Sequence, residues 1–399
     1  MNMTLTTSRA WQIVQKDSRV VVSNILTGRS LSVESHIRTL LDFCKTAKAE
    51  KDIVTYLKQF IPSTSIDATI STLLRKRILV SDEDDIFTDT IPVRPTLWGC
   101  AHSVSSSTQI VILGAPFGLG NAEDIRCKNF PLHLRDFVHG YYSFRNQVDN
   151  LDRLNPIVVG PWFDFPNFKE TLRSKSIADI GDVIFYCGET PEMFYTRLKN
   201  ISKDIVHNGL IPICIGGDHS ITYPIVATIN EINTPFVILH FDAHADMKNG
   251  VVMKLHEQSG YKLVNHANVI KHIIGFENVE HIYQIGIREP FLYDNKKITR
   301  ISVQDINSSK NTDILKEIET PVYITFDVDF FDPSLAPGTA TVLPNGGDYN
   351  NTFRFLAQIL KHKRILGMDI VEANPALDVQ NKTTLLVNNL LMQIISQIK

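Results

Sequence analysis

The sequence predicts an α/β protein in which helices enclose a parallel β-sheet, preceded by a smaller α+β unit. Three observations lead to this fold class. The chain has 399 residues, enough for a large domain and a small one. Its C-terminal three quarters alternate short apolar runs with amphipathic stretches, which is typical of strand–helix–strand units. The first ~80 residues instead show a few short strands followed by three helical patterns.

The N-terminal unit is predicted to be winged-helix-like and to span residues 1–85. An acidic segment, two prolines and a serine run then predict a linker at 86–108, and 109–399 is predicted to be one catalytic domain. The elements expected in the N-terminal unit are strands at 11–14, 19–22 and 29–33, helices at 34–47, 51–60 and 65–76, and a closing apolar run at 78–80.

The apolar runs of the catalytic domain are nearly continuous, as expected for strands that are buried on both faces. In an open parallel sheet the ligand site lies outside the carboxyl ends of the strands, so we expect the functional residues there. The predicted strands lie at 110–113, 211–215, 236–241, 281–287, 322–326 and 365–370, and helical periodicity covers 192–207, 349–361 and 382–398.

Composition excludes several classes of protein. The net charge of −3 provides no global basic field for nucleic acid or an anionic membrane. No run approaches the roughly 20 apolar residues of a membrane span, and the first residues do not resemble a signal peptide. The five cysteines are scattered and form no Cys-x-x-Cys pair, which is typical of reduced thiols in a cytoplasmic protein.

Three short segments carry the residues suited to chemistry, and each follows a predicted strand. The first, Ile-Gly-Gly-Asp-His-Ser, brings one histidine to the end of strand 211–215. In the second, His-Phe-Asp-Ala-His-Ala-Asp, two aspartates and the histidine between them alternate at a spacing of two, which puts three side chains on one side of an extended chain. The third, Thr-Phe-Asp-Val-Asp, repeats this spacing. The candidate ligands are His219, Asp242, His244, Asp246, Asp327 and Asp329.

Four carboxylates gathered in one place repel one another strongly, so they require cations or protons to neutralise them. Two imidazoles and four carboxylates, without cysteine, suit a pair of divalent ions of the Mn, Ni, Co or Zn kind. Two such ions can share one water and lower its pKa, which gives hydroxide near neutral pH. A lone Gly-Asp-His turn or Asp-x-Asp pair is usually structural, but the three segments together indicate a binuclear metal hydrolase.

The three segments resemble the motifs of the ureohydrolase family, which includes arginases, agmatinases and guanidinobutyrases. The likeness runs from about residue 110 to the C-terminus. It implies a three-layer α/β/α sandwich around an eight-stranded parallel sheet, and two manganese ions bridged by Asp242 and Asp327. The remaining ligands would be His219 and Asp246 for one ion, and His244 and Asp329 for the other.

The resemblance implies hydrolysis of a guanidino group to urea and an amine, with Asp246 orienting the attacking hydroxide. Gly-Met-Asp-Ile-Val-Glu-Ala-Asn-Pro resembles the family segment whose glutamate binds the guanidinium group, so Glu372 is assigned to that role. The family's proton-relaying histidine lies after the second motif, at the start of a helix. His266 fits that position, and His256 is the alternative. Asp182 fits a structural motif of the family, without a catalytic role.

Two departures from the family pattern concern the substrate. Arginases that act on free arginine follow the second motif with a polar loop, whereas this chain has Met-Lys-Asn-Gly-Val-Val-Met-Lys-Leu. The N-terminal unit is similar to the winged-helix peptide-recognition domains of enzymes that modify ribosomal peptides. Together these features favour an arginine within a precursor peptide as substrate, with an ornithine residue as product.

Other interpretations remain open at the level of sequence. A small-molecule enzyme would act on agmatine, guanidinobutyrate, guanidine or arginine, and formiminoglutamase chemistry is a further alternative. A regulator would bind DNA through the N-terminal unit, but the mixed charges and acidic end of that unit argue against this. The resemblance also implies a homo-oligomer.

Overall fold

The computed structural model describes residues 4–8, 11–16, 19–24, 30–76, 78–81, 90–91, 93, 95–142, 159–186, 188–248, 264–290, 294–308, 313–361 and 363–398. The chain divides into two units, Met1–Ile91 and Pro92–Lys399. Across these described ranges, no helix is both long and apolar enough to cross a bilayer.

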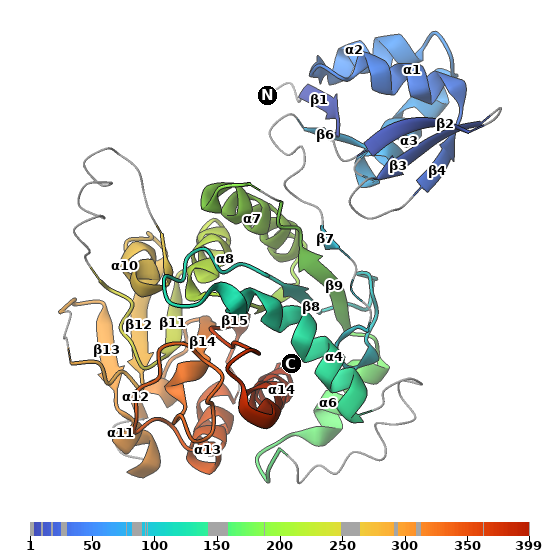
Figure 1. The fold of residues 1–399 in the computed structure, drawn as a ribbon. Coiled ribbons are helices and arrows are strands. Elements are labelled where there is room, and N and C mark those ends of the chain that lie inside the picture. The colour runs from blue at the N-terminus through green and yellow to red at the C-terminus, as the bar shows by residue number, and fades with distance from the viewer. Residues whose placement is uncertain are drawn as a thin grey trace. The chain divides into compact units, whose positions relative to one another are not determined.

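The larger unit is built on a sheet of eight parallel strands, in agreement with the predicted fold class (Figure 1). Within this unit the strands lie in the order β13-β12-β11-β14-β15-β10-β8-β9. Their bounds are β8 (Ile110–Gly114), β9 (Ile177–Val183), β10 (Ile211–Ile215), β11 (Phe236–Phe241), β12 (Val279–Ile285), β13 (Ile298–Ile301), β14 (Val322–Asp327) and β15 (Ile365–Val371).

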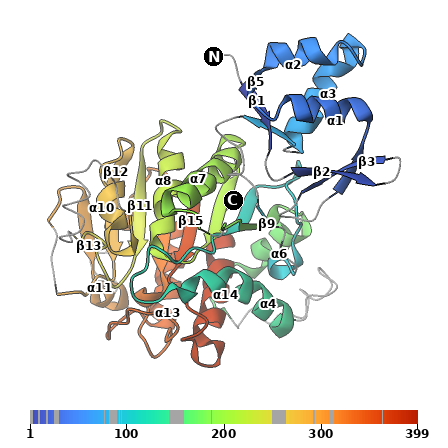
Figure 2. The same cartoon turned by 45° about the horizontal axis from the view of Figure 1, so that its top comes forward.

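Helices cover both faces of this sheet, which gives the three layers seen in Figures 1 and 2. Strand side chains alternate between two apolar cores: Ile112 packs in one with α4, α6, α11, α13 and α14, and Leu113 packs in the other with α7, α8 and α10. The helices are α4 (Phe130–Tyr142), α6 (Phe165–Arg173), α7 (Pro191–His207), α8 (Thr222–Asn230), α10 (Val269–Ile273), α11 (Val303–Ser308), α12 (Asp313–Lys316), α13 (Tyr349–Leu360) and α14 (Lys382–Ile395).

Two strands of the sheet, β9 and β13, were not among the predicted apolar runs. Strand β9 reads Ile-Ala-Asp-Ile-Gly-Asp-Val, so Asp179 and Asp182 interrupt its apolar pattern. Arg135 on α4 is fully buried and neutralises both: its Nε lies 2.7 Å from Asp179 Oδ2, and its Nη1 lies 2.5 Å from Asp182 Oδ1. The ion pairs allow a strand with two acidic residues to lie inside the sheet.

Part of the predicted linker, 86–108, packs against the larger unit. Leu97 and Trp98 are buried in its core, and the indole N–H of Trp98 donates to Asn388 Oδ1 at 3.0 Å. The sequence did not indicate that these two apolar residues are buried, because the prolines and serines around them are typical of a linker. Residues 82–89 lie outside the described part of the chain.

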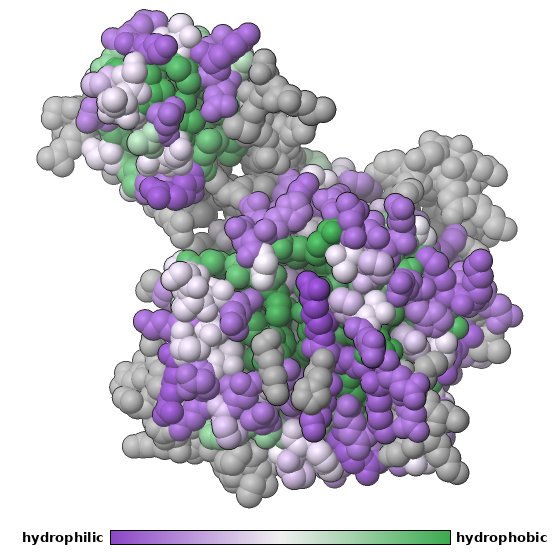
Figure 3. Space-filling model, turned by 180° about the vertical axis from the view of Figure 1, so that it is seen from behind, coloured by the Kyte–Doolittle hydropathy of each residue, from purple (hydrophilic) through white to green (hydrophobic). Residues whose placement is uncertain are grey.

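The N-terminal unit has its own apolar core, formed by side chains such as Leu40, Ile53 and Leu73. Its antiparallel strands β2, β3 and β4 and its three helices follow the predicted order, while β1, β5 and β7 were not predicted. Figure 3 shows apolar side chains among the hydrophilic ones on one face of this unit. The elements are β1 (Thr4–Thr7), β2 (Trp11–Lys16), β3 (Arg19–Asn24), β4 (Ser30–Val33), α1 (Ser35–Phe43), β5 (Lys48–Ala49), α2 (Glu50–Leu57), α3 (Ser63–Arg75), β6 (Leu79–Ser81) and β7 (Thr90–Ile91).

Replacing Arg135 by leucine should destabilise the larger unit by about 3–5 kcal/mol, because two buried carboxylates lose their counter-charge. The measurement is the free energy of unfolding from urea denaturation. Arg126→Leu is the matched control, because Arg126 pairs with Asp124 at the exposed surface, and it should have a much smaller effect. Equal losses in the two variants would contradict a structural role for the buried network.

Candidate metal centre

The predicted ligands gather at the carboxyl ends of adjacent strands. Strands β11, β14, β15 and β10 are neighbours in that order. All six predicted metal ligands follow β10 or β11, or lie at the end of β14, and Glu372 comes directly after β15. The backbone N–H of His219 donates to the side-chain carboxylate of Glu372. Residues that are 153 positions apart in the chain therefore meet at one edge of the sheet.

The turn after β10 is set by close backbone packing. A Cβ atom on Gly217 would lie 1.7 Å from the carbonyl oxygen of Phe117, so only glycine fits there. Asp218 then caps the 3₁₀ turn His219–Ile221 by accepting from the backbone N–H of Ser220 at 3.0 Å. This turn directs the fully buried His219 toward the acidic cluster.

A hydrogen-bond chain fixes the tautomer of His219. The hydroxyl of Thr325 donates to Asp369 Oδ1 at 2.7 Å, so it must accept from the Nε2–H of His219, 2.9 Å away. In the neutral imidazole the other ring nitrogen, Nδ1, then carries the lone pair. Burial lowers the pKa of His219, but in the metal-free protein the carboxylates of Asp242, Asp246 and Asp327 outweigh this and raise the pKa well above its usual value. Nδ1 is buried without a hydrogen bond, although carboxylate oxygens lie within 2.9–3.4 Å. A lone pair facing carboxylates in this way suits a shared cation, and the support through Thr325 and Asp369 is typical of metal-binding histidines.

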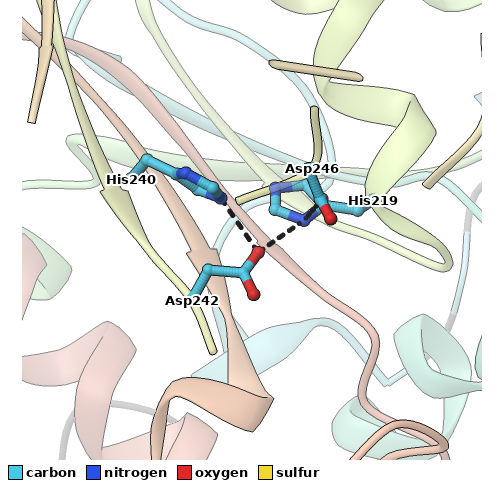
Figure 4. Close-up of side chains that lie close together, drawn as sticks. All are labelled: His219, His240, Asp242 and Asp246. Atoms are coloured by element: carbon cyan, nitrogen blue, oxygen red, sulfur yellow. Dashed lines mark hydrogen bonds and ion pairs between the residues drawn. The ribbon is translucent and has the colours of Figure 1, made fainter. Parts of the chain in front are cut away.

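The carboxylate of Asp242 lies between two imidazoles, His219 and His240 (Figure 4). His240 Nε2 is 2.9 Å from Asp242 Oδ2. By distance alone, His240 could therefore be a metal ligand together with His219, Asp242 and Asp246. However, His240 Nδ1 accepts from Gln284 Nε2 at 3.3 Å, so its proton is on Nε2 and points at Asp242. His240 therefore orients Asp242 and is not itself suited to bind an ion.

The second half of the cluster is formed by His244 and Asp329. His244 Nδ1 lies 2.9 Å from Asp329 Oδ2 and 3.6 Å from Asp242 Oδ1. The backbone N–H of Ala243 donates to Asp329 Oδ1 at 2.9 Å, and the Thr341 hydroxyl is 3.3 Å from Oδ2. These contacts hold Asp329 in place beside His244.

Electrostatics indicates that this cluster is built to hold cations. Burial raises the pKa of the Asp327 carboxyl well above its usual value, and the charges of Asp329 and Asp242 raise it further. Two groups of side chains have ligand atoms within 4.8 Å of one another: one is His219, His240, Asp242 and Asp246, and the other is Asp242, His244 and Asp329. Asp242 is shared, so the donor set fits two divalent ions bound side by side.

Glu372 and His266 lie beside this cluster. The carboxylate of Glu372 is 2% exposed and accepts from the backbone N–H of His219 at 2.9 Å and from Asn121 Nδ2 at 2.7 Å. His266 Nδ1 lies 3.6 Å from Glu372 Oε1, at the start of a 3₁₀ turn that leads into α10. The structure thus brings both predicted residues together, whereas His256 lies outside the described residues.

Two of the acidic side chains stand on unusual backbone. Asp246 has φ +51° and Glu372 has φ +64°, a left-handed conformation that is uncommon for residues other than glycine. Such conformations persist where the surrounding structure enforces them, and they concentrate at functional sites. Here they direct the two carboxylates toward the cluster instead of along the sheet.

Several functional side chains were missed by the sequence prediction. His240 is the first residue of the second segment and lies two positions before Asp242, so the alternation itself could have revealed it. Thr325 and Asp369 lie inside apolar strands, where polar residues are a detectable signal. Asn121 had no such signal, because its contact with Glu372 joins residues that are 251 positions apart.

Protons and cations should compete for Asp329. In the metal-free protein, burial and then the charge of Asp242 raise the pKa of Asp329 to about 6. The carboxylate is ionised above this pH and protonated below it, so the affinity for Mn²⁺ should fall as the pH is lowered through about 6. Calorimetric titration of metal-free protein measures this. Asp329→Asn should bind more weakly and lose this part of the pH dependence, and an affinity that is constant from about pH 5 to 8 would contradict the assignment.

Comparison with known proteins agrees with this geometry. The arginase family profile matches residues 108–396. The agmatinase of Sodalis glossinidius is 29% identical over 290 residues, which cover 71% of this chain and 85% of the relative. The agmatinase of Edwardsiella ictaluri is 31% identical over 242 residues, which cover 59% of this chain and 74% of the relative.

The solved structures show the same fold. Proclavaminate amidino hydrolase from Streptomyces clavuligerus has a TM-score of 0.62 at 20% sequence identity and covers 76% of this chain and 97% of its own. The family match spans most of the chain and includes every predicted site residue. The chain therefore belongs to the arginase family and is a ureohydrolase, an enzyme that hydrolyses amidino C–N bonds.

Proposed function

We propose that this ureohydrolase acts on arginine residues within a peptide, releasing urea and leaving ornithine residues. The observation that carries this proposal is the N-terminal unit, which has its own core and lies outside the matched region 108–396. A small free guanidine needs no second folded unit to bind it. A peptide offers backbone and side chains that such a unit can bind.

Residues of the chain account for substrate binding in this reaction. The Glu372 carboxylate is held by Asn121 and by the His219 backbone, and each of its oxygens keeps a further lone pair. A carboxylate with both oxygens oriented can accept two parallel N–H bonds from a guanidinium group. Since Glu372 also accepts from the backbone of the metal-cluster residue His219, the guanidinium would be held next to the cluster.

Two divalent ions bound to the six ligands, with manganese the ion we propose, would supply hydroxide from water near neutral pH. Asp246 would orient this nucleophile toward the guanidinium carbon. Burial by itself lowers the pKa of His266, but the adjacent Glu372 carboxylate outweighs this and raises the pKa above its usual value. A protonated His266 beside Glu372 is suited to give a proton to the departing amine.

A second candidate substrate is a free guanidine such as agmatine. The relatives of Sodalis glossinidius and Edwardsiella ictaluri are both agmatinases, which favours small-molecule activity for the catalytic unit. The six ligands do not distinguish the two substrates, because they contact only the guanidino end. Location in the cytoplasm and assembly of several copies both stay predictions.

A urea-release assay with Mn²⁺ should separate these substrates. The panel comprises arginine-containing peptides and free agmatine, guanidinobutyrate, guanidine and arginine. We expect the best peptide to exceed every free guanidine in kcat/KM by at least about tenfold, the factor that ~1.4 kcal/mol of additional binding gives. Turnover of free agmatine as fast as any peptide would overturn the peptide proposal and leave the ureohydrolase assignment intact.

Glu372→Gln should lower kcat/KM by roughly 100-fold, because the substrate loses a charged partner worth about 3 kcal/mol. Metal content should remain close to that of the unchanged enzyme, since Glu372 is not among the predicted ligands. Asp327→Asn is the contrasting variant and should lose metal and activity together. Metal analysis by mass spectrometry alongside kinetics distinguishes the two. Loss of metal in Glu372→Gln would move that residue into the ligand set.

A further inference from the structure

A buried tyrosine links two loops beside the metal cluster. Tyr195 lies on α7 and is 7% exposed. Its hydroxyl donates to Ser220 Oγ at 2.7 Å, in the 3₁₀ turn that carries the predicted ligand His219. The same hydroxyl lies 3.3 Å from the carbonyl oxygen of Val264, two residues before His266. One hydroxyl group therefore contacts both the metal-ligand turn and the segment that leads to the proposed proton donor.

Further hydrogen bonds close these contacts into a ring. The hydroxyl of Ser220 donates to Asp218 Oδ1, and Asp218 Oδ2 accepts from the backbone N–H of Gly120 at 2.7 Å. The carbonyl oxygen of Gly120 accepts from the backbone N–H of His266 at 3.1 Å. The tyrosine contact described above completes the ring. We call its members the Tyr195 network: Gly120, Tyr195, Asp218, Ser220, Val264 and His266.

Close packing leaves this network little freedom. The ring of Tyr195 packs on that of Phe117, with 5.3 Å between the ring centroids. A Cβ atom on Gly120 would lie 2.4 Å from Ser220 Oγ, so the loop after β8 packs directly against the turn after β10. Ser220 and Asp218 are fully buried, and water does not readily replace a lost partner there. The tyrosine hydroxyl is therefore a well-defined fixed point on a rigid helix.

The placement of His266 depends on this fixed point. Its Nδ1 lies 3.6 Å from Glu372 Oε1, and its side chain is 17% exposed. Two contacts of the network hold the segment that carries it: the Gly120 carbonyl accepts from its backbone N–H, and the Tyr195 hydroxyl lies against the Val264 carbonyl. A proton donor has to stay within hydrogen-bond reach of the departing group, and a misplacement of ~1 Å can lower a rate about 100-fold.

We propose that Tyr195 is a positioning residue for proton transfer. It holds the segment that carries His266 against the metal-ligand turn, so that the imidazole faces the departing amine. Tyr195 acts through His266 and gives no proton to the substrate itself. The inference rests on the proposed function, because it assigns the proton transfer to His266. It does not depend on whether the guanidine belongs to a peptide or to a free molecule.

Tyr195→Phe removes the hydroxyl and keeps the ring, so the variant should fold. With Mn²⁺ and the fastest guanidine of the panel above, we expect kcat to fall at least about tenfold and KM to change by less than about threefold. Metal content should stay unchanged. Tyr349→Phe is the matched control and should keep its kcat. The Tyr349 hydroxyl donates to the Val159 carbonyl at 3.0 Å and accepts from Asn389 Nδ2 at 3.1 Å, in the core on the other face of the sheet.

A double-mutant cycle decides whether Tyr195 acts through His266. His266→Ala should lower kcat about 100-fold or more. Adding Tyr195→Phe to His266→Ala should lower kcat by less than about a further twofold, because the residue that the tyrosine positions is absent. The same loss from Tyr195→Phe in both backgrounds would show an effect independent of His266 and would overturn the proposal.

Amide hydrogen exchange followed by mass spectrometry gives a second measurement that needs no turnover. The backbone N–H of His266 is protected by its bond to Gly120. Exchange in the segment 264–273 should be faster in Tyr195→Phe than in the unchanged enzyme or in Tyr349→Phe. Equal exchange in all three proteins would contradict the positioning role, whatever the kcat values are.

The outcomes for this role and for the proposed function are distinguishable. Full turnover by His266→Ala would contradict the proposed proton donor, and the positioning role with it. A loss of turnover in His266→Ala, together with a Tyr195→Phe variant that behaves like Tyr349→Phe, would contradict the positioning role alone. Neither result alters the ranking of peptides and free guanidines, because all variants are compared on the same substrate.

Discussion

The mutual repulsion of buried aspartates at the carboxyl ends of adjacent parallel strands is the constraint on which the catalytic unit depends. Asp242, Asp327 and Asp329 are each less than 5% exposed, and the charges of Asp242 and Asp329 add to the burial that raises the pKa of Asp327. No hydrophobic packing compensates for this repulsion. The surrounding polar groups are therefore arranged to hold the carboxylates in place until cations neutralise them.

A second layer of side chains performs this arrangement. Asp369 and Thr325 fix the proton of His219 on Nε2, and Gln284 fixes that of His240 so that it points at Asp242. The Thr325–Asp369 and Gln284–His240 contacts each join neighbouring strands of the sheet, β14 with β15 and β12 with β11. The precision of the cluster therefore comes from the sheet, although most ligands lie on the turns that follow its strands.

The geometry of this site does not identify the molecule to which the guanidino group is attached. In the proposed reaction the ligands, Glu372 and His266 would contact only the guanidino end of a substrate, so they would suit agmatine and a peptide arginine equally. Selectivity has to come from groups outside this cluster, and the chain carries an N-terminal unit with its own apolar core.

The sequence by itself determined the fold class, the three motifs and all six candidate ligands. It could do so because the apolar strands and the His/Asp spacings are local patterns with periods fixed by backbone geometry. The family resemblance added Glu372 and His266. Strand β9 was missed, because its two aspartates are neutralised by Arg135 from a different helix. Only the tertiary structure decided this pairing, the hydrogen-bond partners of His219 and His240, and the contact of Asn121 with Glu372. Each of these depends on side chains that are distant in the chain and meet only after the sheet and helices have packed.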